Sequence, residues 1–146
     1  MLCMKAVSLL GYFAMVGGLL ALLFTGCLLS SSPFVIGAQI AAVLLVIWAR
    51  IAFGMRSFHL AANPTEGGLV TTGPYRFIRH PIYTAICILV TAGAVAHASL
   101  ITWLTCALVW SGGFVRMWCE EKLVAQRYPE YEHYAAKTAR MIPYVF

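Results

Sequence analysis

The stretch TGPYRFIRHPIY, near the middle of the chain, combines residue types that can bind an anion. Arg76 and Arg79 carry fixed positive charges. Proline suits the first turn of a helix, so we expect a helix to begin at Pro81 with His80 at its entry and Tyr83 one turn inside. The N-terminus of a helix presents unpaired N–H groups and a partial positive charge, which favour a bound anion. This stretch therefore predicts a cationic helix entry.

A second group of ionisable residues follows much later in the chain. Arg116 and Glu120 are spaced i, i+4, so they share one helical face and can pair, and Glu121 is adjacent. Solitary charges at a bilayer edge are costly, which favours a partner or a ligand. Taken alone, the two glutamates fit a solvated helix face as well as a site, and Arg76 and Arg79 are better explained as anchors in anionic headgroups. The two groups indicate a site only if the fold brings them together.

The composition predicts that the chain is a membrane protein, so membrane helices must position these residues. Only 10% of the 146 residues are charged and 62% are hydrophobic, whereas a soluble domain carries roughly 25% charged residues. Nucleic-acid binding is disfavoured, because the cations form no continuous basic stripe on a soluble scaffold. The five cysteines have no CxxC spacing, so we expect neither a disulfide framework nor a metal site.

The apolar segments predict an all-α, polytopic fold in a single membrane domain over 1–146. We expect about four transmembrane helices, the last two forming a short hairpin, at about 8–29, 34–55, 82–97 and 99–118. At about 1.5 Å per residue, the first run reaches roughly 33 Å, enough to cross the hydrocarbon core. The region 82–118 would span about 55 Å as one helix, so we divide it near Gly93 to Ser99.

The placement of charge predicts the orientation. All fifteen acidic and basic residues fall on or near one side, whereas the loops at 30–33 and 93–99 carry none. The positive-inside rule therefore places both termini, the loop 56–81 and the segment 119–146 in the cytoplasm. A cleaved signal peptide ending near Cys27 is disfavoured, because the apolar stretch is long for a signal core and only Lys5 precedes it.

The two polar regions contain further local signals. The loop includes the turn dipeptides Asn63-Pro64 and Gly67-Gly68, and between 69 and 72 it is expected to be extended. The segment 128–134 contains three tyrosines and a proline, which predicts a turn and then a short amphipathic helix at interface depth.

Both blocks, in this order and spacing, resemble one family. The motif residues are Gly73-Pro74-Tyr75-Arg76, Arg79-His80-Pro81-Ile82-Tyr83, Glu120-Glu121-Lys122-Leu123, Tyr128, Tyr131, Tyr134 and Arg140-Met141-Ile142-Pro143. They are similar to the isoprenylcysteine carboxyl methyltransferase and phospholipid methyltransferase superfamily of integral membrane enzymes, over about residues 69–143. The resemblance implies S-adenosylmethionine as methyl donor, held in a cytoplasm-facing cofactor pocket.

The resemblance also implies roles for residues of this chain. By position, the donor contacts fall on Leu69, Val70, Tyr75, His80, Pro81, Ile82, Tyr83 and Glu120. Arg79 joins them because a cation beside a helix entry suits the carboxylate of the donor. Arg116 matches the arginine that such enzymes aim at the acceptor. A carboxylate acceptor would need no general base, whereas an amine or thiol acceptor would, and Glu121 and His80 are the candidates.

The expected function is methyl transfer to a lipophilic acceptor that enters from the lipid bilayer. Gly67 stands where prenylcysteine methyltransferases commonly have a histidine, and this difference weakens the case for a prenylcysteine substrate. Ala85 stands where the family usually has a glycine. A prenylcysteine or isoprenoid carboxylate, a lipid amine and a thiol therefore all stay open. The compact length favours a prokaryotic inner membrane over the endoplasmic reticulum, and the sequence does not indicate an oligomeric state.

Two alternatives remain. Membrane sterol reductases share a similar C-terminal half but use a nicotinamide cofactor and are much larger. A small non-catalytic subunit that binds lipid or a partner through its basic loop would have no affinity for the donor.

Overall fold

The computed structural model describes residues 2–54 and 68–143. Its elements are α1 (Leu2–Phe24), α2 (Pro33–Phe53), the 3-10 helix η1 (Gly73–Arg76), α3 (Pro81–His97), α4 (Leu100–Arg127) and α5 (Tyr131–Lys137). Within these residues the only β pairing is one isolated parallel bridge, between Ile78 and Ala139. The predicted all-α fold is confirmed for the described part of the chain.

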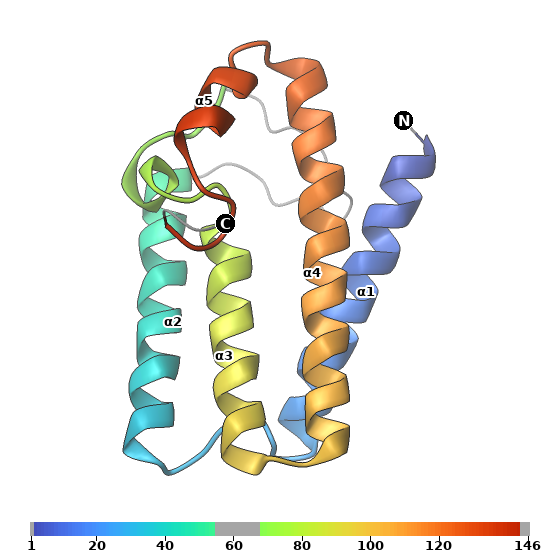
Figure 1. The fold of residues 1–146 in the computed structure, drawn as a ribbon, viewed down its shortest axis with the longest axis vertical. Helices are drawn as coiled ribbons and strands as arrows, with labels where there is room; N and C mark the ends of the chain where they lie inside the picture. The colour runs from blue at the N-terminus through green and yellow to red at the C-terminus, as the bar shows by residue number, and fades with distance from the viewer. Residues whose placement is uncertain (1, 55–67, 144–146) are drawn as a thin grey trace.

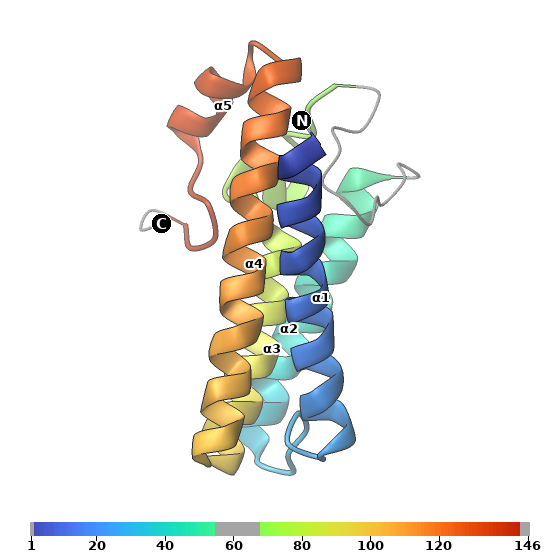
Figure 2. The same cartoon turned by 90° about the vertical axis from the view of Figure 1, so that its right-hand side faces the viewer.

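The long helices form a bundle in which α1 packs chiefly on α4 and α2 on α3 (Figure 1). Figure 2 shows α1 and α4 running alongside each other. A close approach makes this contact possible: a Cβ added at Gly11 would lie 2.8 Å from the carbonyl oxygen of Gly112, and one at Gly112 would lie 2.5 Å from that of Gly11. The absence of both side chains lets the two backbones touch.

Local sequence sets the helix boundaries. Pro33 and Pro81 occupy the first turns of α2 and α3, as predicted for Pro81. The turn between α3 and α4 falls at Ala98 and Ser99, and the side chain of Ser99 caps α4 by accepting a hydrogen bond of 3.1 Å from the backbone N–H of Thr102. This turn lies at the end of the predicted 93–99 window.

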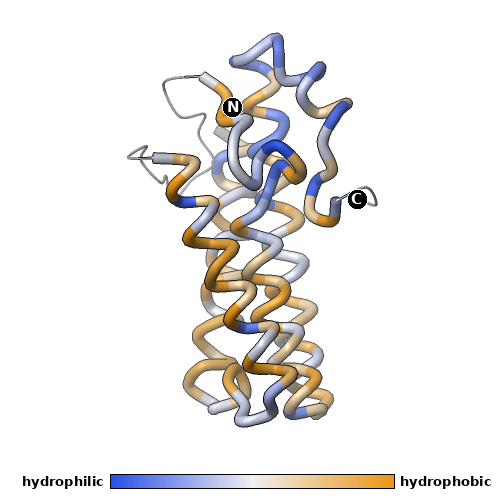
Figure 3. The backbone as a smooth tube through the Cα atoms, turned by 90° about the vertical axis from the view of Figure 1, so that its left-hand side faces the viewer, coloured by the Kyte–Doolittle hydropathy of each residue, from blue (hydrophilic) through white to orange (hydrophobic). Residues whose placement is uncertain are grey.

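Among the helices of the described residues, three, α1, α2 and α4, are long and apolar enough to cross a membrane, and α3 is a shorter apolar helix of 17 residues. Large exposed hydrophobic side chains stand on their outer faces, as at Phe34, which is 91% exposed. Such surfaces suit lipid rather than water. Figure 3 shows the hydrophilic residues gathering at the end of the bundle that carries α5; we call this the polar end.

Two helices differ from the apolar runs that predicted them. The first helix begins and ends earlier than 8–29, because the chain turns at Gly26 with φ +71, and residues before the apolar run continue the helix. The fourth continues past 118 to Arg127, so Arg116, Glu120 and Glu121 lie on one unbroken helix. The turns expected at Asn63-Pro64 and at Gly67 lie outside the described residues.

Candidate functional site

The polar end brings together the two blocks that the sequence singled out. The segment 75–80 and the start of α3 lie beside the last turns of α4, and the C-terminal segment from α5 to Pro143 covers them (Figure 1). Three backbone hydrogen bonds join the loop to that segment: Arg79 N–H to the oxygen of Ala139 (2.8 Å), Ala139 N–H to that of Phe77 (3.1 Å) and His80 N–H to that of Arg140 (3.0 Å). The loop before α3 is therefore held in place by the end of the chain.

Glu121 is the centre of this junction. Its Oε1 lies 3.0 Å from Nε of Arg79 and 3.2 Å from Nε2 of His80. Its Oε2 accepts from Nε of Arg140 at 3.2 Å. Since the side chain of Glu121 is only 13% exposed, these partners replace water as its donors. One carboxylate on α4 thus ties down both the loop and the C-terminal segment.

Arg79 is fixed on both sides. Besides Glu121, it donates through Nη1 to the carbonyl oxygen of Ala135 at 2.8 Å and to that of Thr138. A guanidinium held by a carboxylate and two carbonyls has little rotational freedom. Arg79 therefore has a structural use in addition to the donor contact predicted for it.

Glu120 faces a different set of partners, because adjacent residues on a helix point about 100° apart. The hydroxyl of Tyr83 donates to Oε1 of Glu120 at 2.6 Å, and Nε of Arg116 donates to the same oxygen at 3.1 Å. Nε of Arg116 also lies 2.6 Å from the Tyr83 hydroxyl. We call Tyr83, Arg116 and Glu120 the α3–α4 triad.

The triad is buried on the arginine side and open on the carboxylate side. The Arg116 side chain is 7% exposed, and its guanidinium carbon lies 5.0 Å from the centre of the Tyr12 ring on α1. The Glu120 side chain is 26% exposed. A cation over an aromatic face is stabilised in a site with little water. The accessible group of the triad is therefore its carboxylate.

His80 lies between the two glutamates. Its Nε2 is 3.2 Å from Glu121, its Nδ1 is 4.0 Å from Oε2 of Glu120, and its ring packs edge-on against Tyr83 with centroids 5.6 Å apart. If Nε2 carries the proton that Glu121 accepts, Nδ1 is the unprotonated nitrogen. The helix entry predicted from the sequence therefore connects both carboxylates.

Three tyrosines outside the long helices line the junction. Burial raises the pKa of Tyr134 from 10.0 to about 12, and its hydroxyl donates to the carbonyl oxygen of Tyr75 at 2.7 Å. Burial also raises the pKa of Tyr75 and that of Tyr131. The negative charge of Glu120 adds to the effect at Tyr75, and that of Glu121 adds to it at Tyr131. All three are therefore neutral hydrogen-bonding groups at ordinary pH.

The structure brings together six of the residues predicted for the site: Arg79, His80, Tyr83, Arg116, Glu120 and Glu121. Pro81 is buried at the first turn of α3, and Ile82 follows it, half-buried. Leu69 and Val70 are half-buried in the stretch before η1, and no polar contact joins their apolar side chains to the triad.

Sequence reasoning missed three contributors. Tyr12 was only part of an apolar run, and nothing in the sequence pairs it with Arg116. Tyr131 and Arg140 stood in the motif blocks but received no role, although both act on Glu121. Their motif positions were the available signal. Within 2–54 and 68–143, no three His, Cys, Asp or Glu side chains group as a metal ion would require.

Comparison with known proteins adds an independent observation. A family model described as phospholipid methyltransferase matches residues 32–131. A nickel-cobalt-cadmium resistance protein, NccN, from Alcaligenes xylosoxydans xylosoxydans is 34% identical over 80 residues, which cover 51% of this chain and 36% of that protein. The chain thus matches little more than a third of that relative. No solved structure matches the chain.

Proposed function

This chain belongs to the phospholipid methyltransferase family of integral membrane proteins, and we propose that it transfers a methyl group from S-adenosylmethionine to a lipophilic acceptor. The transfer takes place at the polar end, which we assign to the cytoplasmic side from the distribution of charge. The acceptor enters from the bilayer, and the water-soluble donor enters from the cytoplasm.

The observation that carries the proposal is the α3–α4 triad. A buried arginine, a tyrosine and a partly exposed glutamate lie within 3.1 Å of one another at the end of a lipid-facing bundle. Ionised groups at the edge of a bilayer are costly unless they bind a ligand or a partner. The triad combines with His80 from the loop, so the site contains chemistry from both motif blocks.

The residues present fit the donor. The Glu120 carboxylate, being 26% exposed, can accept hydrogen bonds from an amine or from ribose hydroxyls. The neutral phenols of Tyr83 and Tyr75 can line a sulfonium cation or an adenine ring. When bound, the donor supplies an electrophilic methyl group on sulfur. These side chains then have to align it with the acceptor and exclude water, which are the main requirements of a displacement at carbon.

The contacts of Glu121 favour a positioning role over proton abstraction. Donors from Arg79, His80 and Arg140 all stabilise its charged form, which makes the carboxylate a weak base. For an amine or thiol acceptor, Nδ1 of His80 is the better proton acceptor, because Glu121 holds the other ring nitrogen. For a carboxylate acceptor, Arg116 would supply the orienting charge.

The test is transfer of labelled methyl from S-adenosylmethionine to a membrane lipid extract, using purified protein in liposomes. We expect label in an extractable lipid with wild type and with Glu132→Gln, and at least about tenfold less with Glu120→Gln. Arg116→Lys should lower turnover more than donor affinity. A folded wild type that labels no lipid and binds no donor would instead support a non-catalytic membrane subunit.

A further inference from the structure

Helix α1 lies outside the region that the family model matches, yet it reaches the candidate site. The match begins at residue 32, whereas α1 ends at Phe24. The ring of Tyr12 on α1 lies 5.0 Å from the guanidinium carbon of Arg116, the buried cation of the α3–α4 triad. The hydrogen bonds of the triad described above join α3 to α4, so α1 supplies a contact of a different kind.

Glycines on both sides of Tyr12 fix the register of α1 against α4. A Cβ added at Gly11 would lie 2.8 Å from the carbonyl oxygen of Gly112, and one at Gly18 would lie 2.6 Å from Cγ2 of Val109. Two close approaches, about two helical turns apart, leave α1 little freedom to slide or rotate along α4. Tyr12 is therefore carried to one fixed position beside α4.

The directions of the two helices explain why these side chains meet. Helix α1 runs away from the polar end, whereas α4 runs towards it (Figure 1). Side chains lean towards the N-terminus of their own helix, so Tyr12 leans towards the polar end and Arg116 leans away from it. Nearer the polar end, Met4 packs against the buried cluster of Cys119 and Leu123. Helix α1 thus stays against α4 along the whole height of the triad.

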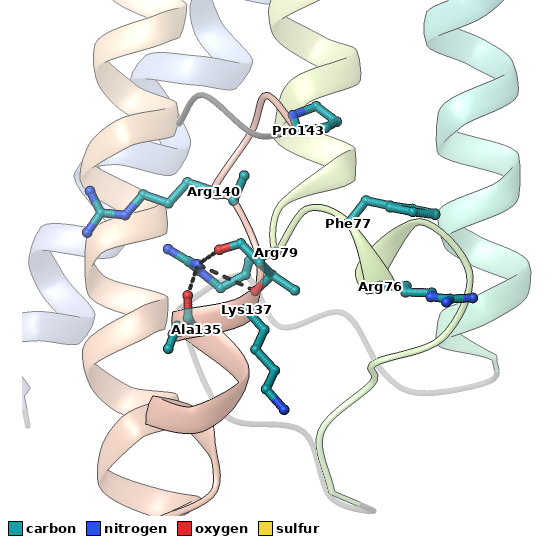
Figure 4. Close-up of a pocket in the computed structure, with 10 residues that line it drawn as sticks. Arg76, Phe77, Arg79, Ala135, Lys137, Arg140 and Pro143 are labelled. Atoms are coloured by element: carbon teal, nitrogen blue, oxygen red, sulfur yellow. Dashed lines mark hydrogen bonds between the residues drawn. The ribbon is translucent and has the colours of Figure 1, made fainter.

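The guanidinium of Arg116 is held by its edge and by its face. Nε at the edge lies 2.6 Å from the Tyr83 hydroxyl and 3.1 Å from Oε1 of Glu120. A planar guanidinium bonded only at its edge can still tilt about those bonds, whereas an aromatic ring over its face fixes the plane. Arg79 is restrained differently, by carbonyl oxygens of the C-terminal segment such as that of Ala135 (Figure 4). Arg116 depends on α1 for the corresponding restraint.

We propose that Tyr12 is a positioning residue for methyl transfer: its ring sets the plane of the Arg116 guanidinium and hence the direction in which this cation holds the acceptor. This role rests on the proposed function, because it requires that Arg116 act on the acceptor. A cation held in the wrong plane still attracts the acceptor but aligns it poorly, and alignment is a main requirement of a displacement at carbon. Loss of the ring should therefore lower turnover and leave donor binding at Glu120 unchanged.

The test measures labelled methyl transfer to a membrane lipid extract at saturating S-adenosylmethionine, together with the KM for the donor. Tyr12→Leu and Tyr12→Met keep apolar bulk without a ring, and both should lower the turnover rate at least about fivefold while the donor KM changes less than about twofold. Tyr12→Phe keeps the ring and should retain at least about half of the wild-type rate. The matched control, Phe24→Leu, removes an 83% exposed ring from the other end of α1. Its rate should change less than about twofold.

A double-mutant cycle of thermal unfolding adds a measurement that needs no activity. Tyr12→Leu should lower the melting temperature by at least about 2 °C more in the wild-type background than in the Arg116→Gln background. The reason is that only the wild-type background has a contact between cation and ring to lose.

Three results would overturn the positioning role alone. Equal losses of turnover in Tyr12→Phe and Tyr12→Leu would assign the effect to the hydroxyl and not to the ring. A parallel loss of donor affinity in Tyr12→Leu and Tyr12→Met would make Tyr12 a part of the donor site or of the fold. Additive changes in melting temperature would mean that the ring does not hold Arg116. A folded wild type that transfers no methyl would refute the proposed function itself, and the positioning role with it.

Discussion

Nε of Arg79 lies 3.0 Å from Oε1 of Glu121, although the two residues are 42 positions apart in the chain. This ion pair joins the loop before α3 to the last turns of α4, and Arg140 and His80 complete it. Sequence motifs placed both residues in a site, Arg79 as a donor contact and Glu121 as a candidate base. Their contacts show that they also hold the polar end together.

The first prediction concerns this junction. Glu121→Gln keeps the shape of the side chain but removes the charge, so it should destabilise the C-terminal segment by about 2 kcal/mol. Limited trypsin digestion in detergent should then cleave after Lys137 and Arg140 about thirtyfold faster than in wild type, because local opening becomes more frequent. Glu132→Gln, an exposed change on α5, should cleave at the wild-type rate. Equal acceleration in both variants would contradict a specific role for Glu121.

The second prediction tests the crossing of α1 and α4. A methyl group at Gly11 would lie 2.8 Å from the backbone oxygen of Gly112, which cannot rotate away, whereas one at Gly17 meets nothing within 4 Å. Gly11→Ala should cost about 1–3 kcal/mol through overpacking. Gly17→Ala should be neutral or stabilise by up to about 1 kcal/mol through helix propensity. Thermal unfolding monitored by circular dichroism checks this. Equal melting temperatures for Gly11→Ala and Gly17→Ala would show that α1 and α4 do not approach each other closely at Gly11.

The third prediction separates the triad from its surroundings. Tyr83→Phe removes the hydroxyl that bridges Arg116 and Glu120 but keeps the ring. Loss of hydrogen bonds to charged partners is worth about 1.5–3 kcal/mol each, so methyl transfer should fall roughly ten- to hundredfold. Tyr12→Phe keeps the ring that contacts Arg116 and should retain most of the activity. If Tyr12→Phe is as damaging as Tyr83→Phe, the hydroxyl of Tyr83 has no special role.

The fourth prediction is a pH dependence. The folded state raises the pKa of Tyr134 from 10.0 to about 12 and raises those of Tyr75 and Tyr131 as well. A raised pKa means that the folded state favours the neutral phenol, so the stabilisation is complete below pH 10 and is lost as the pH rises towards 12 and beyond. Absorbance of tyrosinate and circular dichroism, recorded in one alkaline titration, should show these tyrosines ionising together with loss of structure. Ionisation of every tyrosine near pH 10 with the fold intact would contradict their burial.

Much of this architecture could be predicted because it depends on local signals. Pro81 begins α3 through the fixed geometry of proline. The turn before α4 falls inside a window chosen from helix length and from the breaks in apolar character at Gly93, His97 and Ser99. The boundaries of α1 were harder to predict from the sequence. Hydropathy measures the length of the apolar run, whereas a turn at Gly26 determines where the helix ends. An apolar run does not reveal a helix that continues into polar residues, as α4 does.

The partners within the site could not be predicted in the same way. Which glutamate faces Tyr83 and which faces Arg79 depends on the rotation of α4 against α3, and this rotation is set by packing between distant residues. The contact of Tyr12 with Arg116 depends in turn on the crossing at Gly11 and Gly112. Motif resemblance could gather these residues into one region, but only the packed helices assign each contact.

The most direct test of the central claim is the binding of S-adenosylmethionine to purified protein in detergent, measured by calorimetry without any acceptor. We predict saturable binding by wild type and by Glu130→Gln, a control at an exposed position. Glu120→Gln should bind at least about tenfold more weakly, because the charged acceptor for the donor's hydroxyls or amine is lost. A folded wild type that shows no binding, or a Glu120→Gln variant with unchanged affinity, would contradict the assignment of this site to the methyl donor.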